Sequence, residues 1–239
     1  MALHHNPRIV TSGLVLALDA ADINSYPGSG TTWYDVSGNS SNATFSESPT
    51  IVDKSFYLNY PPAILVDSTD IPINSTSGFT FSFWFKSVSS GGYQYIFGCE
   101  NGTGTEYFDI NVDGYFGYAE MYYSQDSDYY YFKADLPAGQ DPNNFLDEWH
   151  NFTLVVNNAS QTVTAYWNSV SSTITSLDGA PYWPYQFLPT RTSIAVFSGP
   201  DGYYNAFEGY GSSTYIYGRA LTQAEIQQNF TVQKSRYGL

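Results

Sequence analysis

Residues 109–120 satisfy the spacing of a calcium-binding loop, D-x-[DN]-x-[DN]-G-x5-E, from Asp109 to Glu120. In EF-hands this pattern binds calcium because two flanking helices hold the loop oxygens around the ion. The flanks here, residues 105–108 and 122–124, are instead rich in aromatic β-formers and poor in helix formers. We therefore expect no EF-hand in this segment.

The same segment has the pattern of a β-hairpin. Apolar and polar residues alternate from 108 to 113, which is the period of a half-buried strand. Asp113 and Gly114 tolerate positive φ, so they predict a two-residue turn before residues 115–118 return as a second strand. We interpret residues 109–120 as strand, turn and strand.

Paired carboxylates facing one sugar would indicate glycoside hydrolysis, with the two groups about 5 Å apart in retaining enzymes. The sequence contains no E-x-D-x-x-E motif. In the predicted hairpin Asp109 and Asp113 lie on either side of the turn, and Glu106 faces away from Asp109. We expect no catalytic residues, and a polysaccharide hydrolase with an unrecognised carboxylate pair is kept as an alternative.

Other reactive side chains have structural interpretations. The sequence DEWH at residues 147–150 could suggest acid–base chemistry, but it is more typical of the start of a core strand. His4 and His5 form a weak candidate metal pair at the terminus. Cys99 is the only cysteine, which excludes an internal disulfide, and we expect it to be a small buried hydrophobe.

Composition and charge exclude several classes of function. Eight Lys and Arg residues against 22 Asp and Glu give a formal charge of −14, so we expect no nucleic-acid partner. No apolar run reaches the 18 residues of a membrane span, and the first residues resemble no secretion signal. An aromatic content of 18%, with 23 Tyr and 16 Phe, favours strands over helices.

Short strands separated by turn residues recur along the whole chain. In residues 79–86 four phenylalanines share one face, which predicts a strand with one side in the core. We predict further strands over residues 14–19, 56–59, 63–66, 93–99, 152–156, 163–167, 193–197 and 214–217, and a hairpin turn at 157–160. Thr222 and Glu225 have capping-box spacing, which predicts a short helix over residues 222–230. The fold class is all-β, a two-sheet antiparallel sandwich with one short C-terminal helix.

Two predicted loops concentrate Tyr and Trp among polar residues, at 124–132 and 181–187. Aromatic rings supply a large contact area with little side-chain entropy to lose. We predict that these loops contact a glycan or a protein partner, and the alternative is that they cover a sheet edge. The candidate contact residues are Tyr129, Tyr130, Tyr131, Tyr182, Trp183 and Tyr185.

Three stretches carry distinctive motifs: residues 12–45, with the turn W-x-D-x-S-G-N; residues 148–170, a W-H strand and hairpin; and residues 215–239, which contain Y-G-R-A-L-T-Q-A-E-I. Together they resemble the LamG-like family of concanavalin A-type jelly rolls, in the variety found in phage and other viral structural proteins. The resemblance implies a jelly roll over residues 12–239, preceded by an arm at 1–11. Ser169 stands where the family usually has Gly, from which we expect a less demanding turn.

The resemblance also bears on calcium. In some relatives the D-x-S-G-N loop binds calcium together with acidic residues of the terminal strand, which would make Asp35 and Asn39 metal ligands here. The terminal strand of this chain has Ser212 and Ser213 instead of acidic residues. The preferred interpretation is that Asp35 caps backbone amides of the Ser37–Asn39 turn, so no cofactor is expected, with Ca²⁺ as the alternative.

The resemblance implies a non-enzymatic virion surface protein, namely a capsid decoration, fibre subunit or tail adhesin of a bacteriophage or other virus. We expect it to be made in the host cytoplasm without a signal peptide and to reside in the virion. Its partners would be other virion proteins, further copies of itself in a multi-copy assembly, and a cell-surface glycan bound weakly. A free carbohydrate-binding lectin is the main alternative.

Overall fold

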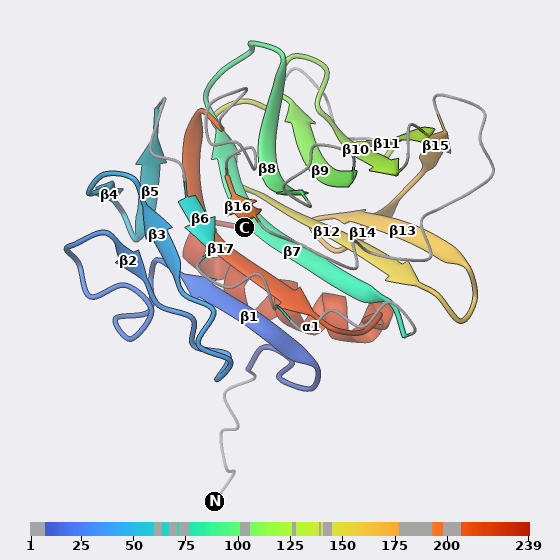
Figure 1. The fold of residues 1–239 in the computed structure, drawn as a ribbon. Helices are drawn as coiled ribbons and strands as arrows, with labels where there is room; N and C mark the ends of the chain where they lie inside the picture. The colour runs from blue at the N-terminus through green and yellow to red at the C-terminus, as the bar shows by residue number, and fades with distance from the viewer. Residues whose placement is uncertain are drawn as a thin grey trace, which may run out of the picture.

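Two antiparallel β-sheets pack face to face in the computed structural model (Figure 1). The structure describes residues 8–59, 64–66, 71, 77–100, 106–125, 128–138, 140, 145–176, 193–197 and 207–239. Its regular elements there are strands, apart from α1 (Gln223–Gln233) and the short 3-10 helix η2 (Lys234–Tyr237). The predicted all-β sandwich with one C-terminal helix is therefore confirmed.

In the described residues the first sheet has eight strands, in the order β14-β13-β12-β7-β17-β5-β4, with β1 also paired to β17. These strands are β1 (Leu14–Asp19), β4 (Thr50–Val52), β5 (Ser55–Leu58), β7 (Phe79–Ser87), β12 (His150–Asn157), β13 (Thr162–Trp167), β14 (Val170–Ser172) and β17 (Gly209–Tyr217).

The second sheet has nine strands within the same described ranges, in the order β15-β11-β10-β9-β8-β16-β6-β3-β2. These strands are β2 (Thr32–Trp33), β3 (Ala43–Phe45), β6 (Ile64–Val66), β8 (Tyr93–Glu100), β9 (Glu106–Asp113), β10 (Tyr118–Gln125), β11 (Asp128–Asp135), β15 (Ile174–Ser176) and β16 (Ser193–Val196).

Phenylalanine rings from both sheets fill the space between them. The Phe81 ring on β7 lies 4.6 Å from Phe97 of β8 and 5.8 Å from Phe108 of β9, measured between ring centroids. All three side chains are at most 1% exposed. Burying one such ring stabilises the fold by about 1.5–3 kcal/mol, so this cluster is a major part of what joins the sheets.

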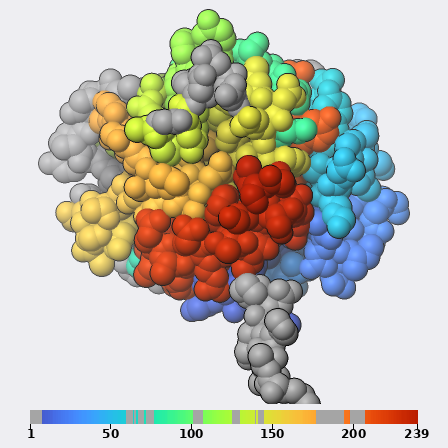
Figure 2. Space-filling view, turned by 180° about the vertical axis from the view of Figure 1, so that it is seen from behind, coloured from blue at the N-terminus to red at the C-terminus, as the bar shows by residue number. Residues whose placement is uncertain are grey.

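The opposite face of β7 is covered by the C-terminal helix. Trp84 stacks on Phe230 of α1 and on Tyr237 of η2, with centroid distances of 5.6 and 4.0 Å. In Figure 2 this C-terminal segment, in red, lies across the face of the molecule. The helix therefore covers the outer face of the first sheet.

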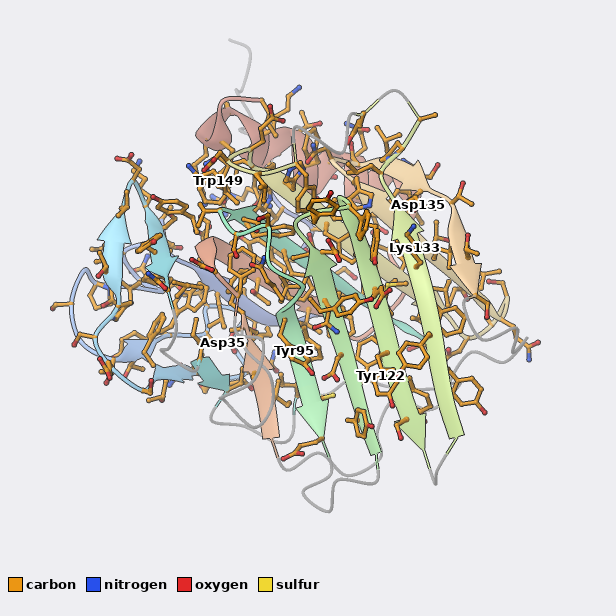
Figure 3. The ribbon with its side chains drawn as sticks, turned by 90° about the horizontal axis from the view of Figure 1, so that it is seen from above. Asp35, Tyr95, Tyr122, Lys133, Asp135 and Trp149 are labelled. Carbon is orange, nitrogen blue, oxygen red and sulfur yellow. The ribbon has the colours of Figure 1, made fainter. Side chains whose placement is uncertain are left out.

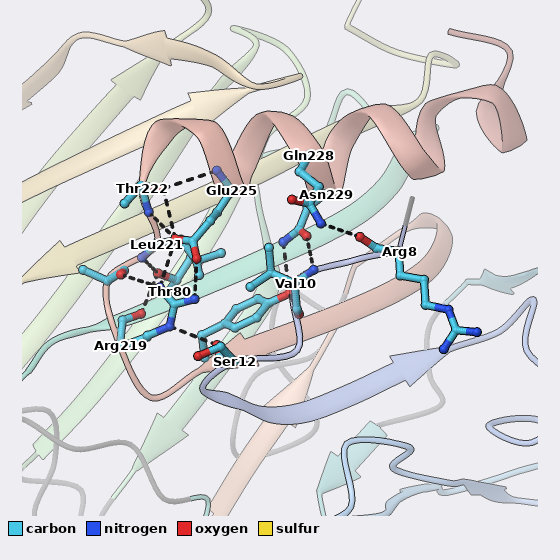
Figure 4. A network of polar contacts seen from close by, with 12 residues as sticks. Arg8, Val10, Ser12, Thr80, Arg219, Leu221, Thr222, Glu225, Gln228 and Asn229 are labelled. Atoms are coloured by element: carbon cyan, nitrogen blue, oxygen red, sulfur yellow. Dashed lines mark hydrogen bonds and ion pairs between the residues drawn. The ribbon is translucent and has the colours of Figure 1, made fainter. Parts of the chain in front are cut away.

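A polar network fixes the start of α1 (Figure 4). Thr222 and Glu225 form the predicted capping box, in which the Glu225 backbone N–H donates to Thr222 Oγ1 and the Thr222 N–H donates to Glu225 Oε2. Arg219 adds an ion pair to Glu225 at 2.6 Å. Further along α1, the Val10 N–H donates to Asn229 Oδ1, which ties the N-terminal segment to the helix.

Three local predictions are wrong. Residues 124–132 are not a loop, because β10 and β11 pair through Gln125 and Asp128 and residues 128–132 belong to β11. The β9–β10 turn spans residues 114–117 rather than two residues, since Asp113 Oδ1 accepts the N–H groups of Tyr115 and Phe116. The turn at Ser169 is as demanding as one with Gly, because Asn168 and Ser169 have φ of 50° and 67°.

The remaining expectations about elements agree with the structure. The predicted strands that fall in described residues all occur, with boundaries shifted by at most five residues, and residues 158–161 form the turn from β12 to β13 that was predicted at 157–160. Cys99 is fully buried. Neither helix in the described ranges is both long and apolar enough to cross a membrane. His4 and His5 lie outside the described residues.

Glu225 is expected to control stability at acid pH. The hydrogen bond from Arg219 lowers its pKa to about 2. Its stabilising contribution is therefore present above the ordinary pKa of 4.5 and is lost as the pH falls toward 2. Replacement by Gln should lower the unfolding midpoint at pH 7 by about 2–4 °C, the equivalent of about 1 kcal/mol.

Circular dichroism melts from pH 7 to 2 would check this expectation. The gap between Glu225→Gln and the natural chain should close in the acid range, while Glu47→Gln, at an exposed site, should change little at any pH. A gap that stays constant from pH 7 to pH 2 would show that the charge of Glu225 does not matter.

Candidate functional site: a tyrosine-lined groove

The outward side chains of β8 to β11 form a surface of tyrosines and polar residues on four neighbouring strands. Alternation places Phe108, Ile110 and Val112 in the core, so that Asp109 and Asn111 point away from it. The pairing register then places residues of neighbouring strands side by side. Figure 3 looks onto this face, with Tyr95 and Tyr122 labelled on it.

Two cross-strand rows make up the centre of this face. In one row Tyr95 of β8 pairs with Asn111 of β9, which pairs with Glu120 of β10, which pairs with Lys133 of β11. In the next row Asp109, Tyr122 and Tyr131 are neighbours. The Cβ atoms of neighbours in such rows lie about 4.5–5.5 Å apart. Their side chains are therefore close enough to contact one ligand together.

These rows enclose a groove of about 520 Å³. That volume is within the range of small-molecule and oligosaccharide sites. The residues that line the groove, which we call the tyrosine groove, are Tyr93, Tyr95, Tyr107, Asp109, Asn111, Glu120, Tyr122 and Tyr131.

Glu120 is a nearly buried carboxyl group in the tyrosine groove. It is only 8% exposed, and burial together with the nearby charge of Asp113 raises its pKa above the ordinary value. A hydrogen bond from Tyr93 and the charge of Lys133 act in the opposite direction. Lys133 is shared with Asp135 at 2.8 Å, so Glu120 is only partly neutralised.

The tyrosine hydroxyls in the groove form a connected chain. The hydroxyls of Tyr107 and Tyr122 are 2.9 Å apart, and Tyr122 is also hydrogen-bonded to Tyr131. Burial and these bonds raise the pKa of Tyr122 far above its ordinary value. The groove therefore presents neutral hydroxyls, which both donate and accept hydrogen bonds, beside ring faces that are apolar.

Asn111 supplies an uncommitted acceptor. Its side chain is 8% exposed, and its Oδ1 atom is buried without a hydrogen-bond partner among the described residues. Buried polar atoms in folded proteins are nearly always paired, and an exception at the bottom of a groove indicates a place for a ligand donor such as a hydroxyl. No three His, Cys, Asp or Glu side chains of the described chain gather closely enough to hold a metal ion.

The sequence located only part of this site. Of the predicted contacts, Tyr131 lines the groove and is 39% exposed, whereas Tyr130 packs against the core. The Tyr129 side chain, like residues Tyr182, Trp183 and Tyr185, lies outside the described part. The expectation that Asp109 and Asp113 lie on either side of the turn is wrong, because both belong to β9.

The other groove residues were not predicted. Tyr93, Tyr95, Tyr107, Glu120 and Tyr122 occupy polar or aromatic positions opposite apolar ones in strands that the pattern partly revealed. The alternation of apolar and polar residues around Tyr95 and Tyr107 could have indicated that both side chains point away from the core. The pairing of distant strands, which brings them together, was not readable from spacing.

Asp35 has the capping role that the sequence favoured. Its Oδ1 accepts the N–H groups of Ala17 and Ser37 at 2.8 and 2.9 Å, and its Oδ2 accepts the Ser41 N–H and the Ser37 hydroxyl. Asn39 donates its side-chain amide to the Val15 carbonyl at 3.1 Å. Both side chains are thus engaged in holding this loop against β1.

His150 is also structural. Its Nε2 lies 3.0 Å from the Phe145 carbonyl, and its ring stacks on Phe145 at 4.5 Å. Burial lowers the pKa of His150 to about 4, so the imidazole is neutral near pH 7. This agrees with the interpretation of residues 147–150 as the start of a core strand.

Comparison with known proteins identifies the family. The sequence model of the concanavalin A-like lectin/glucanases superfamily (Laminin_G_3) matches residues 63–227, which is more than half of the chain. The chain belongs to this superfamily. A search of curated protein sequences found no match to the chain.

Solved structures with the same fold include binding domains and parts of glycosidases. Domain 4 of AbnA, an extracellular arabinanase from Geobacillus stearothermophilus in complex with arabinotriose, is 15% identical with a TM-score of 0.59, covering 90% of this chain and 97% of that domain. The binding domain of botulinum neurotoxin DC, in complex with rat synaptotagmin II, is 15% identical with a TM-score of 0.63, covering 93% of this chain and 52% of that one.

A Trypanosoma rangeli sialidase is 14% identical, with a TM-score of 0.63, and the match covers 95% of this chain and 34% of the sialidase. This concanavalin A-like chain therefore spans about half of the toxin domain and a third of the sialidase. At such low identity these likenesses show the fold alone.

The Tyr93 hydroxyl should hold down the pKa of Glu120 in this superfamily member. Replacing Tyr93 by Phe removes a donor that favours the charged carboxylate, so the pKa of Glu120 should rise further. A carbon-13 NMR titration of the Glu120 carboxyl would measure the change, with Tyr34→Phe as a control at another exposed tyrosine. An unchanged Glu120 pKa in Tyr93→Phe would contradict the hydrogen bond.

Proposed function

We propose that this chain is a non-enzymatic carbohydrate-binding protein and that the tyrosine groove binds a neutral glycan. One observation carries the proposal. Five tyrosines and the acceptors Asp109, Asn111 and Glu120 lie together on one face of the second sheet. Apolar ring faces suit the C–H faces of a sugar, and carboxylate and amide oxygens accept hydrogen bonds from its hydroxyls. The superfamily and the binding domains among its structural neighbours support the same class of function.

The charge of the tyrosine groove determines which glycans it accepts. Asp109 and Glu120 line it, and the nearest basic side chain, Lys133, is already paired with Asp135. An anionic sugar entering this groove would meet like charge in a partly desolvated site, which costs free energy. We therefore assign neutral hexoses or pentoses to the groove.

Glycan binding can be tested with Tyr95→Ala and Tyr131→Ala. Removing one stacking ring should weaken binding of a neutral oligosaccharide by about tenfold, since aromatic contacts contribute about 0.5–1.5 kcal/mol beyond area burial. A glycan array with the protein displayed in multiple copies would select the sugar. Isothermal titration calorimetry would then give the affinities.

Tyr34→Ala is the matched control, because Tyr34 is 43% exposed and does not line the groove. Chelation of divalent ions should leave the affinity unchanged, because the oxygens of Asp35 are taken by backbone and hydroxyl donors. Array binding that persists in both groove variants would contradict the assignment of the site.

We further propose that the protein acts in many copies on a virion surface, as a capsid decoration, fibre subunit or tail adhesin. The resemblance of residues 12–45, 148–170 and 215–239 to viral structural proteins supports this. A charge of −14 would keep a crowded surface soluble, and display in many copies raises the avidity of a weak site by about 10²–10⁴. Partners would be copies of the chain and other virion proteins.

The viral proposal is tested by quantitative mass spectrometry of purified particles from the source of this gene. We expect the chain in a fixed ratio to the major capsid protein, in multiple copies per particle. Its absence from washed particles that otherwise contain their full set of structural proteins would contradict the proposal, and a free lectin would then be the better account.

Glycoside hydrolysis is the second candidate function, favoured by one observation. Glu120 has a raised pKa, as a general acid needs, and Asp109 lies diagonally across the strand pair from it. The residue directly opposite Glu120 is Asn111 rather than a carboxylic acid, which is why we favour binding. Release of reducing sugar from a bound glycan, abolished in both Glu120→Gln and Asp109→Asn, would establish the enzyme instead.

A further inference from the structure

A second hollow, of about 480 Å³, lies on the outer face of the first sheet beside η2. It is formed where β4, β5, β7, β17 and the residues after α1 meet. We call it the cationic pocket, and its polar and aromatic lining consists of Asp53, Ser55, Lys86, Trp149, Tyr210, Arg236 and Tyr237. None of these residues belongs to the tyrosine groove, which is on the other sheet.

Lys86 presents an ammonium group between two rings. Its Nζ lies 4.3 Å from the centroid of Tyr210 and 5.9 Å from that of Trp149. It has no ion pair with any described carboxylate. The rings hold the ammonium by cation–π attraction, and this leaves its N–H donors available to a ligand.

Arg236 places a second cation in the same pocket. Its Nη1 donates to both oxygens of Asp19, at 2.7 and 2.9 Å, so these two charges largely compensate each other and Lys86 supplies the unpaired charge of the pocket. The other terminal nitrogen, Nη2, makes no hydrogen bond to a described residue, and the side chain is 31% exposed. Tyr237, the next residue, packs its ring against Trp84 and Trp149 and so fixes this wall.

The charge of the cationic pocket stands out against the rest of the protein. The chain has eight basic residues against 22 acidic ones. Two of the basic residues, Lys86 and Arg236, line this one pocket. The acidic side chain in the lining is Asp53, which is exposed at the turn between β4 and β5.

We propose that the cationic pocket binds an acidic sugar residue, a hexuronate, through its carboxylate and its ring. The carboxylate would accept hydrogen bonds from the Lys86 ammonium and the Arg236 guanidinium, which are strong because both partners are charged. The sugar ring would lie against Trp149 and Tyr210. The two sheets would thus recognise different sugars, neutral ones in the tyrosine groove and acidic ones here.

The test compares methyl β-D-glucuronide with methyl β-D-glucoside by NMR titration. The reporter is the indole N–H signal of Trp149, identified by its loss in Trp149→Phe. We expect the glucuronide to shift this signal with a dissociation constant at least tenfold below that of the glucoside. Binding should weaken as sodium chloride is raised from 50 to 500 mM.

Lys86→Met keeps the length and apolar stem of the side chain and removes its charge. It should weaken glucuronide binding about tenfold, whereas Lys86→Arg should retain most of it. Tyr131→Ala should leave it unchanged, so failure of the tyrosine groove and failure of this pocket are distinguishable. Unfolding midpoints within 2 °C of the natural chain would show that the Lys86 variants are folded.

Three results would overturn the proposal. One is equal affinity for glucuronide and glucoside, and another is glucuronide binding that is unaffected in folded Lys86→Met. The third is binding of acetate as tight as that of glucuronide, because the pocket would then be a carboxylate trap to which the sugar ring adds nothing.

Discussion

Alternation of side chains across the strands is the constraint on which the other features depend. The contacts among Phe81, Phe97 and Phe108 require β7 of the first sheet to present its phenylalanine face to β8 and β9 of the second. Because the period is two, each ring that enters the core fixes a neighbour that points outward. A slip of one residue in β9 would bring Asp109 and Asn111 into the core, so the packing that stabilises the sandwich also sets the groove.

The two outer faces have different surroundings as a result. The first sheet places Trp84 outward, and the C-terminal helix covers it with Phe230 and Tyr237. The cationic pocket lies beside η2, at the end of this C-terminal segment. The second sheet places tyrosines and carboxyl groups outward, and they form an acidic groove. Carboxyl groups thus line the groove on one sheet, whereas Lys86 and Arg236 line the pocket on the other.

Local features of this fold were predictable because their causes are local in the sequence. The alternation in residues 79–86 follows from strand geometry, and the Thr222–Glu225 capping box sets the helix start. The interpretation of residues 109–120 as a hairpin rather than a calcium loop followed from their flanks. The segment 124–132 was assigned to a loop because its polar residues obscured the alternation of Tyr130 and Phe132 toward the core.

The candidate site was less predictable because it depends on pairing between strands. A register shift between Tyr95 and Phe97 places Tyr95 opposite Asn111, and no spacing within β8 reveals that partner. Likewise, Glu120 meets Lys133 only through the β10–β11 register. The cationic pocket needs residues as far apart as Asp53 and Arg236, which the folded chain alone brings together.

A crystal structure of the protein with a neutral tetrasaccharide selected on the array would test the central claim most directly. We predict sugar density along the outer face of β8 to β11, with a ring against Tyr95 or Tyr122 and a hydroxyl donating to Asn111 Oδ1. Sugar bound at another surface, with the tyrosine groove empty at saturating ligand, would contradict the account.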